Sequence, residues 1–272
     1  MQTRLEDFTV DSQFDVDEVH RCVKRWGTAV LPKWLDTRRL DGLRQDFEDV
    51  LAAEDGGAYY KIGYPAGRAA SVSRLKLPEG KHPFIQDVFQ DSKIAAMAKR
   101  YVGNPCLLNY ELYATHEFNG SGVVAPTHFD KLWTLKFMIY LEDVNPGDCP
   151  FGVIPGSATV ARQRFRKVFE RHSLKMLEMS SDAYHQMGND QVPGELAPVI
   201  DIVAPAGTLI VFDTDTFHRA GVLEPGRQRK VMRGHSGPSE VYKKVPKHGR
   251  QWWRGEKAFG RLGSFMEKLK TG

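Results

Sequence analysis

One short segment of the sequence places two metal-binding side chain types two residues apart. In Pro126-Thr127-His128-Phe129-Asp130, an imidazole and a carboxylate occupy positions i and i+2. In an extended strand these positions point to the same face of the sheet. His128 and Asp130 can therefore converge on one metal ion, and the segment predicts two members of a metal site.

A third ligand would have to come from elsewhere in the chain. His218 is the candidate, because it follows a short apolar run and the turn-forming residues Asp213-Thr214-Asp215-Thr216. Two imidazoles and one carboxylate on one face of an octahedron leave three coordination positions open, the arrangement used by non-haem Fe(II) oxygenases. We interpret Asp213 and Asp215 as turn residues that orient the His218 loop.

The tripeptide alone is weak evidence. With nine His and nineteen Asp in 272 residues, chance alone predicts about 0.6 His-x-Asp matches. A single histidine beside a strand is more often a hydrogen-bonded structural residue than a ligand. The order of the motifs strengthens the metal hypothesis: His-x-Asp precedes a long apolar segment, and a later His is followed by a basic pair.

That basic pair is Arg227 and Arg229, in the segment Pro225 to Val231. A dicarboxylate co-substrate that chelates a metal ion through its keto-acid end needs a cation at its other end. Arginine suits this role because its planar fork binds a carboxylate through two hydrogen bonds and stays charged when buried. Considered alone, each residue is as readily explained as a turn-exposed arginine.

The elements that must position these residues change along the chain. Apolar spacing predicts helices at 15–26, 36–51 and 84–101, with Gly27 ending the first helix, Asp36 capping the second and a short strand at 28–31 between them. Strands are expected at 106–118, 132–144, 199–203, 209–212 and 230–234. Helices followed by strands favour an α+β, mainly β fold whose sandwich or barrel carries the chemistry.

At this point the sequence resembles the phytanoyl-CoA dioxygenase-like family of Fe(II)/2-oxoglutarate oxygenases. Residues 26–32 look like the family's first strand, and residues 140–144 are similar to its sheet core. The segment 151–157, which ends in Pro-Gly-Ser, looks like a family loop. His128 and Asp130 resemble the first two iron ligands, and His218 would be the distal one. Arg229, eleven residues after His218, would pair with the 2-oxoglutarate carboxylate.

The resemblance implies a double-stranded β-helix (jelly-roll, cupin-like) core with flanking N-terminal helices. It also implies one Fe(II), with 2-oxoglutarate and O2 as co-substrates. The expected reaction is a dioxygenase oxidation, by default hydroxylation, of a C–H bond in a small-molecule metabolite, with succinate and CO2 as co-products. Desaturation, ring closure and epoxidation are further outcomes of the same chemistry.

The chain departs from the family pattern at two places. Cys149 stands where the family usually has Gly, before Pro150-Phe151. The family often has a hydroxyl residue two positions after the distal His, and this chain has Ala220 there. The second partner of the 2-oxoglutarate carboxylate is therefore open, with Lys136, Thr134 and Tyr110 as candidates. Arg227 is the alternative clamp if the turn before it is longer.

Two other classes of protein remain as alternatives. One is a catalytically silent jelly-roll protein that binds a ligand at the mouth of the barrel. The other is a cupin-type metalloenzyme without 2-oxoglutarate, which His128-Phe129-Asp130 disfavours because cupins tend to show His-x-His.

The composition of the chain bears on its expected partners and its cellular location. The net charge is +4, and nine Lys or Arg against three Glu follow residue 239. No nucleic-acid motif accompanies this basic tail, so we expect a solvated surface and no nucleic-acid partner. The longest apolar runs are far shorter than the ~18 residues of a membrane span. Three widely spaced cysteines and the absence of a signal peptide favour the reducing cytoplasm.

The expected organisation is one domain over residues 1–272. We divide it into a mainly helical flank at 1–104, the jelly-roll core at 105–239 with a charged insertion at 158–190, and a basic C-terminal segment at 240–272. The sequence leaves the oligomeric state open.

Overall fold

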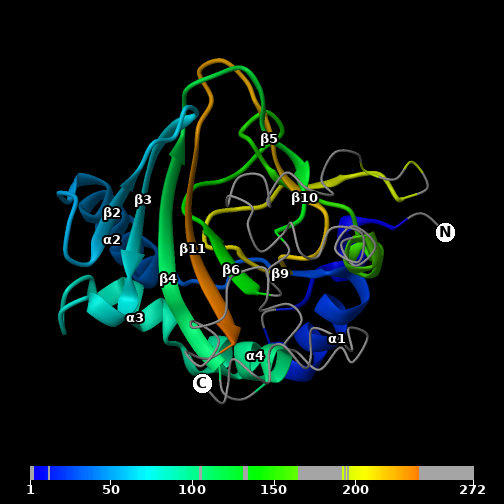
Figure 1. Cartoon of the computed structure of the whole chain (residues 1–272), viewed down its shortest axis with the longest axis horizontal. Helices are drawn as coiled ribbons and strands as arrows, with labels where there is room; N and C mark the ends of the chain where they lie inside the picture. Colours follow the sequence, from blue (N-terminus) through cyan, green and yellow to red (C-terminus); the bar gives the residue numbers. More distant parts are fainter. Residues whose placement is uncertain are drawn as a thin grey trace, which may run out of the picture.

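The computed structural model describes residues 3–11, 13–103, 106–130, 134–164, 192, 194 and 196–238. Its strands form two antiparallel sheets, shown in Figure 1. The larger sheet has the order β1-β9-β6-β11-β4-β3-β2, and the smaller has the order β5-β10-β7-β8. The strands are β1 (Thr28–Leu31), β2 (Tyr59–Ile62), β3 (Gly67–Ser73), β4 (Cys106–Glu117), β5 (Gly122–His128), β6 (Leu135–Tyr140), β7 (Phe151–Val153), β8 (Ile200–Ile202), β9 (Leu209–Asp213), β10 (His218–Leu223) and β11 (Arg229–Pro238).

The path of the chain identifies the architecture. From β4 to β11 the chain passes repeatedly between the two sheets: β4, β6, β9 and β11 lie in the larger one, and β5, β7, β8 and β10 in the smaller one. This is the double-stranded β-helix, or jelly roll, that the sequence predicted. Because the two sheets face each other, residues from both can meet between them.

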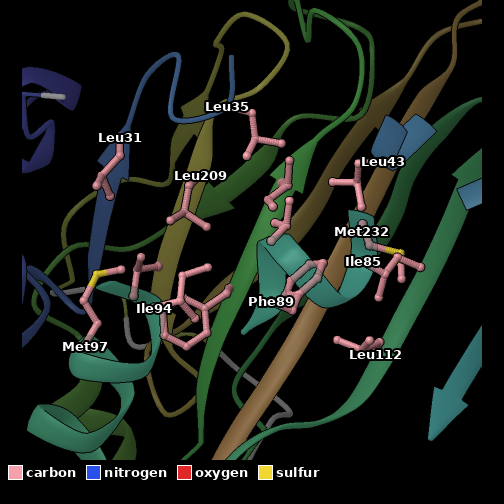
Figure 2. Packing of buried hydrophobic residues seen from close by; sticks show 14 of the residues in the cluster. Leu31, Leu35, Leu43, Ile85, Phe89, Ile94, Met97, Leu112, Leu209 and Met232 are labelled. Carbon is pink, nitrogen blue, oxygen red and sulfur yellow. The ribbon is translucent and has the colours of Figure 1, made fainter. Parts of the chain in front are cut away.

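Helices cover the other face of the larger sheet. They are α1 (Val16–Trp26), α2 (Thr37–Ala52), α3 (Pro83–Phe89) and α4 (Ser92–Val102), with single 3-10 turns at Leu5–Phe8 and Arg74–Lys76. As expected, the Asp36 side chain caps α2, and Gly27 ends α1 with a φ of 82°. The Asp15 side chain caps α1. Figure 2 shows the resulting core, in which Leu43, Phe89 and Met97 from the helices pack near Leu209 and Met232 of the sheet.

The helical flank differs from the prediction in two ways. The N-terminal region also contains β2 and β3, which extend the larger sheet beyond β4. The helix predicted over 84–101 is two helices, α3 and α4. The break occurs because the Asp91 side chain accepts a hydrogen bond from Lys93 N and starts a new helix.

The alternation of side chains defines an inner face of the larger sheet. On β6, Phe137 and Ile139 pack with the helices, whereas Met138 and Tyr140 pack between the sheets. On β11, Met232 belongs to the helix side and Val231 to the inner side. Since side chains alternate along a strand, the inner face also carries five charged residues of these strands and of β4. These are Lys136, Arg229, Arg233, Glu111 and Glu117.

Two expected segments lie largely or wholly outside the described residues. Residues 165–191, most of the predicted insertion, and residues 239–272, with the basic tail, are among them. Within the part of the chain that the structure describes, no helix is both long and apolar enough to cross a membrane.

Candidate active site

The structure brings together the three residues that the sequence singled out as metal ligands. His128 ends β5 and His218 begins the neighbouring β10, where the two are directly paired, with ring centroids 4.5 Å apart. Oδ1 of Asp130 lies 3.4 Å from Nε2 of His128 and 3.8 Å from Nε2 of His218. All three ligand atoms lie within 4.8 Å of one another, close enough to contact one ion.

Hydrogen bonds set the orientation of both imidazoles. Nδ1 of His128 donates to Pro126 O, and Nδ1 of His218 donates to Thr216 O, each at 2.7 Å. A carbonyl oxygen can only accept, so Nδ1 carries a hydrogen in each ring, and Nε2 is the nitrogen that faces the Asp130 carboxylate. Burial, with His128 nearby, lowers the pKa of His218 to about 3. His218 is therefore a neutral imidazole near pH 7, which is the form that binds a metal ion.

Lys136, a candidate partner of the co-substrate, contacts Asp130. Its Nζ lies 2.5 Å from Oδ2 of Asp130, the oxygen that is not directed at the two imidazoles. Burial alone would raise the pKa of Asp130, but the Lys136 ammonium and His218 hold it well below its usual range. With one oxygen held by Lys136, the carboxylate offers the other to a metal ion.

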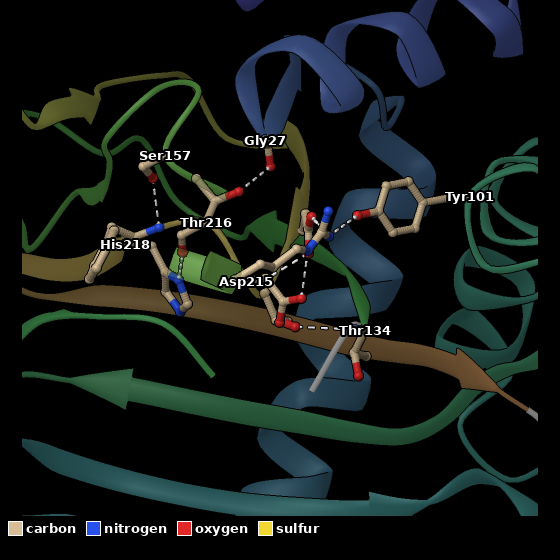
Figure 3. A network of polar contacts seen from close by, with 11 residues as sticks. Gly27, Tyr101, Thr134, Ser157, Asp215, Thr216 and His218 are labelled. Carbon is tan, nitrogen blue, oxygen red and sulfur yellow. Dashed lines mark hydrogen bonds and ion pairs between the residues drawn. The ribbon is translucent and has the colours of Figure 1, made fainter. Parts of the chain in front are cut away.

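The loop between β9 and β10 positions two of the three residues, and Figure 3 shows its contact with His218. Asp130 N donates to Thr214 O at 2.8 Å, while Thr216 O accepts the hydrogen bond from His218. The Pro-Gly-Ser segment also holds this loop, because Ser157 Oγ accepts from Phe217 N at 2.9 Å. The predicted turn thus orients His218, and it also fixes the backbone of Asp130.

Arg162 binds this loop through ion pairs with Asp213 and Asp215. Its guanidinium lies 2.5 Å from Asp213 Oδ2 and 3.0 Å from Asp215 Oδ2, and it donates to the Tyr101 hydroxyl at 3.2 Å. Both carboxylates are buried. Sequence reasoning missed Arg162 because its partners lie 51 and 53 residues away, and no local spacing links them.

Replacing Arg162 with methionine should weaken metal binding without touching a ligand. The variant leaves Asp213 and Asp215 side by side without their cation, which loosens the loop that holds His218 and Asp130. Loss of such a supporting contact typically costs about 10- to 100-fold in metal affinity. Calorimetric titration with Fe(II) or Co(II) measures this. The double variant Arg162→Met/Asp213→Asn should recover part of the metal affinity. An unchanged metal affinity in Arg162→Met would show that Arg162 does not support the metal site.

Two arginines were considered as partners of the 2-oxoglutarate carboxylate. Arg229 is buried between the two sheets, whereas Arg227 is exposed at the surface. The Arg227 side chain is 52% exposed, 3.6 Å from Asp148. Arg229 is 3% exposed, and its Nε and Nη2 donate to Glu117 at 3.2 and 2.9 Å. Its Nη1 is buried and has no hydrogen-bond partner among the described residues. Burial alone would lower the pKa of Arg229, but Glu117 outweighs it and raises that pKa.

Glu117 is a second residue that sequence reasoning missed. It is 1% exposed, bound to Arg229 and to the Tyr64 hydroxyl, which donates at 3.1 Å. Only the pairing of β4 with β11, which sets Glu117 opposite Arg229, could have identified the contact.

Thr134 and Tyr110, the remaining co-substrate candidates, lie at the other end of β11. A Cβ added to Gly237 would lie 3.8 Å from Thr134 Oγ1 and 3.7 Å from Tyr110 Cε1. Eight residues of extended strand, about 26 Å, separate Gly237 from Arg229. The structure therefore does not bring Thr134 or Tyr110 together with Arg229.

A comparison with protein families shows which family the chain belongs to. The profile of the phytanoyl-CoA dioxygenase (PhyH) family matches residues 23–231. The chain belongs to this family. The PhyH match includes the His128-x-Asp130 segment, His218 and Arg229. It makes the protein an Fe(II)- and 2-oxoglutarate-dependent oxidoreductase, as the resemblance implied.

Solved structures share the fold of this PhyH-family chain. The epimerase SnoN from nogalamycin biosynthesis, in complex with Fe3+, alpha-ketoglutarate and nogalamycin RO, is 19% identical, with a TM-score of 0.60 over 82% of this chain and 83% of that one. The carbocyclase SnoK from nogalamycin biosynthesis is 17% identical, with a TM-score of 0.56 over 87% and 86% of the two chains. HygX from Streptomyces hygroscopicus, with nickel, 2-oxoglutarate and hygromycin B bound, is 14% identical, with a TM-score of 0.54 over 82% and 87%. The comparison with curated protein sequences found no match.

The residues of this PhyH-family site suit the cofactor and co-substrate. Two imidazoles and one carboxylate form the donor set of a non-haem Fe(II) centre. The unpaired, buried Nη1 of Arg229 suits a carboxylate oxygen, since a buried donor without a partner is costly.

Proposed function

We propose that the enzyme hydroxylates a C–H bond of a small molecule at an iron held by His128, Asp130 and His218. The observation that carries the proposal is the convergence of one oxygen and two Nε2 atoms, with both Nδ1 hydrogens directed at carbonyl groups. Such a set binds Fe(II) and leaves three positions for the co-substrates.

Bound Fe(II) supplies the site at which O2 and 2-oxoglutarate react. The balance is one C–H bond, O2 and 2-oxoglutarate converted to one C–OH bond, succinate and CO2, with one oxygen atom in the alcohol and one in succinate. The protein's residues contribute orientation. Lys136 and the Thr214 carbonyl hold Asp130, the Thr216 carbonyl holds His218, and Arg229 binds the distal carboxylate of 2-oxoglutarate.

Two features of the fold relatives support a small-molecule substrate. SnoN was solved with nogalamycin RO and HygX with hygromycin B. SnoN is an epimerase and SnoK a carbocyclase, so related jelly rolls direct the same co-substrates to different outcomes. Hydroxylation is the outcome that needs no further group beyond those described above.

An anaerobic titration tests the iron and co-substrate assignment. The protein is mixed with one equivalent of Fe(II) and titrated with 2-oxoglutarate while the visible absorption is recorded. We expect the weak charge-transfer band of the chelate to rise and saturate at one equivalent per chain. A band that never forms, although Fe(II) binds, would contradict co-substrate binding at this iron.

Replacing Arg229 should weaken 2-oxoglutarate binding far more than iron binding. Arg229→Ala leaves Glu117 buried without a cation, so the clean variant is Arg229→Met/Glu117→Gln, which removes both charges. We expect the dissociation constant for 2-oxoglutarate to rise at least about thirtyfold, equivalent to ~2 kcal/mol. The same anaerobic titration measures it. Arg227→Ala is the control. If it weakens 2-oxoglutarate binding strongly while the Arg229 variant does not, the carboxylate partner is Arg227 and not Arg229.

A further inference from the structure

Arg233 is a second arginine on the inner face of β11 that lacks an anionic partner. Its Nη2 donates to Thr115 Oγ1 at 3.1 Å, and its guanidinium lies over the Tyr113 ring, 5.6 Å from the centroid. Among the described residues, no carboxylate lies within 4.0 Å of it, and its Nε is buried without a hydrogen-bond partner. Arg233 is partly buried, and a guanidinium whose buried Nε lacks a hydrogen-bond partner favours an anion.

The register of the strands places Arg233 between the metal triad and Arg229. His235 is paired with Lys136, the residue that contacts Asp130, and Arg233 lies one inner-face position further along β11. Arg229 follows two inner-face positions beyond Arg233, at the start of the strand. The order along the inner face is therefore the triad, Arg233 and then Arg229.

The Arg233 side chain extends along β4 toward the end of the strand where Arg229 and Glu117 lie. Arg233 is paired with Tyr113 but its guanidinium reaches Thr115, which lies toward Glu117, the partner of Arg229. Thr115 and Glu117 are neighbours on one face of the strand, about 7 Å apart. Each guanidinium has one buried nitrogen without a partner: Nε of Arg233 and Nη1 of Arg229.

The charge of the inner face suits a dianion once iron is present. This region contains three cationic and three anionic side chains, so their charges cancel. They are Lys136, Arg229 and Arg233, and Asp130, Glu111 and Glu117. Fe(II) adds two positive charges, and 2-oxoglutarate carries two negative ones. In addition, residue 220, two positions after His218, is alanine and offers no side-chain donor to a carboxylate.

We propose that Arg233 is the second partner of the distal carboxylate of 2-oxoglutarate and shares that carboxylate with Arg229. This rests on the proposed function, because it presumes that the keto-acid end is chelated at His128, Asp130 and His218. Arg233 takes the role that a hydroxyl at position 220 would fill, with a full positive charge in place of a dipole.

Three substitutions and two co-substrates test this. Arg233→Met removes the charge and the fork, Arg233→Lys keeps the charge, and Lys230→Met is the matched control. Lys230 adjoins Arg229 on β11 but points to the other face, where it pairs with Glu48 and Glu142. Each protein is loaded anaerobically with Fe(II) and titrated with 2-oxoglutarate and with 2-oxopentanoate, which has the same chain length but no distal carboxylate.

The Arg233→Met variant should bind 2-oxoglutarate about 10- to 100-fold more weakly than the unmodified protein, from the loss of a charge-assisted hydrogen bond. Its affinity for 2-oxopentanoate and for Fe(II) should stay within twofold. Arg233→Lys should fall between, and Lys230→Met should match the unmodified protein.

Other results overturn the inference. Unchanged 2-oxoglutarate binding by Arg233→Met, or equal weakening for both keto acids, would remove Arg233 from the carboxylate site and leave the proposed function intact. If the unmodified protein binds Fe(II) but neither keto acid, the proposed function itself fails.

Discussion

Replacing His218 with alanine is expected to abolish iron-dependent turnover and to weaken Fe(II) binding by more than about a hundredfold. The substitution deletes one of three ligands, a loss larger than the 10- to 100-fold typical of supporting contacts. His218 is buried, 5% exposed, and neutral near pH 7, so alanine leaves no other donor among the described residues at that position. Calorimetric titration of the apoprotein with Fe(II), under argon, measures the affinity. His128→Ala should behave in the same way.

The control for this experiment is a second cluster of possible ligands. Asp46, Asp49 and His82 also bring three ligand atoms within 4.8 Å of one another. Structural contacts already occupy this cluster: Asp46 Oδ2 accepts from Phe84 N and Ile85 N at the start of α3, and His82 Nε2 contacts the Tyr59 hydroxyl at 2.8 Å. We therefore expect His82→Ala to keep iron affinity. Loss of binding in His82→Ala with full binding in His218→Ala would overturn the triad.

The sequence predicted those parts of the molecule that follow local rules. The i, i+2 geometry of a strand was enough to pair His128 with Asp130. Apolar spacing and Gly27 marked α1, Asp36 marked the start of α2, and a plain apolar run marked β9. The resemblance to the family supplied the jelly roll. It also supported His218, which no spacing rule connects to His128 and which its place after an apolar run and a turn had suggested.

Contacts that depend on sheet register could not be predicted in this way. Glu117 and Arg229 are 112 residues apart, and they meet because β4 and β11 are adjacent with one particular alignment. A shift of one residue would turn Glu117 to the helix side of the sheet. Arg162 is a similar case, because its ion pair with Asp215 depends on where the loop after β9 lies in the fold. In addition, Lys136 shares the inner face with Arg229, but the structure places its ammonium on Asp130.

Asp130 is expected to determine which ligand the iron transfers to the substrate. A carboxylate on the metal occupies the coordination position that a halide would need. The unmodified enzyme should therefore form hydroxylated product and no chlorinated product when substrate, 2-oxoglutarate, O2 and chloride are supplied together. Mass spectrometry of the products measures this. Chlorinated product from the unmodified protein would contradict the role of Asp130, as would undiminished hydroxylation by Asp130→Ala.

The Asp130→Gly variant should open that position and also create a site for an anion. Lys136 Nζ lies 2.5 Å from the deleted carboxylate, so the variant leaves a buried ammonium without its partner. A halide at the vacated position would lie close to both the iron and this ammonium. We expect Fe(II) to bind more weakly than in the unmodified protein, through His128 and His218. Chloride should then shift the visible band of the Fe(II)–2-oxoglutarate complex, an observation that needs no substrate.

A matched double variant separates the two effects of the deletion. Asp130→Gly/Lys136→Met opens the same coordination position but removes the cation that would attract the halide. If Lys136 recruits the anion, this variant should need a chloride concentration at least about tenfold higher for the same spectral shift, the equivalent of ~1.4 kcal/mol. Equal chloride dependence in the two variants would show that the iron alone holds the halide. In that case the contact between Lys136 and Asp130 would serve only to orient the carboxylate.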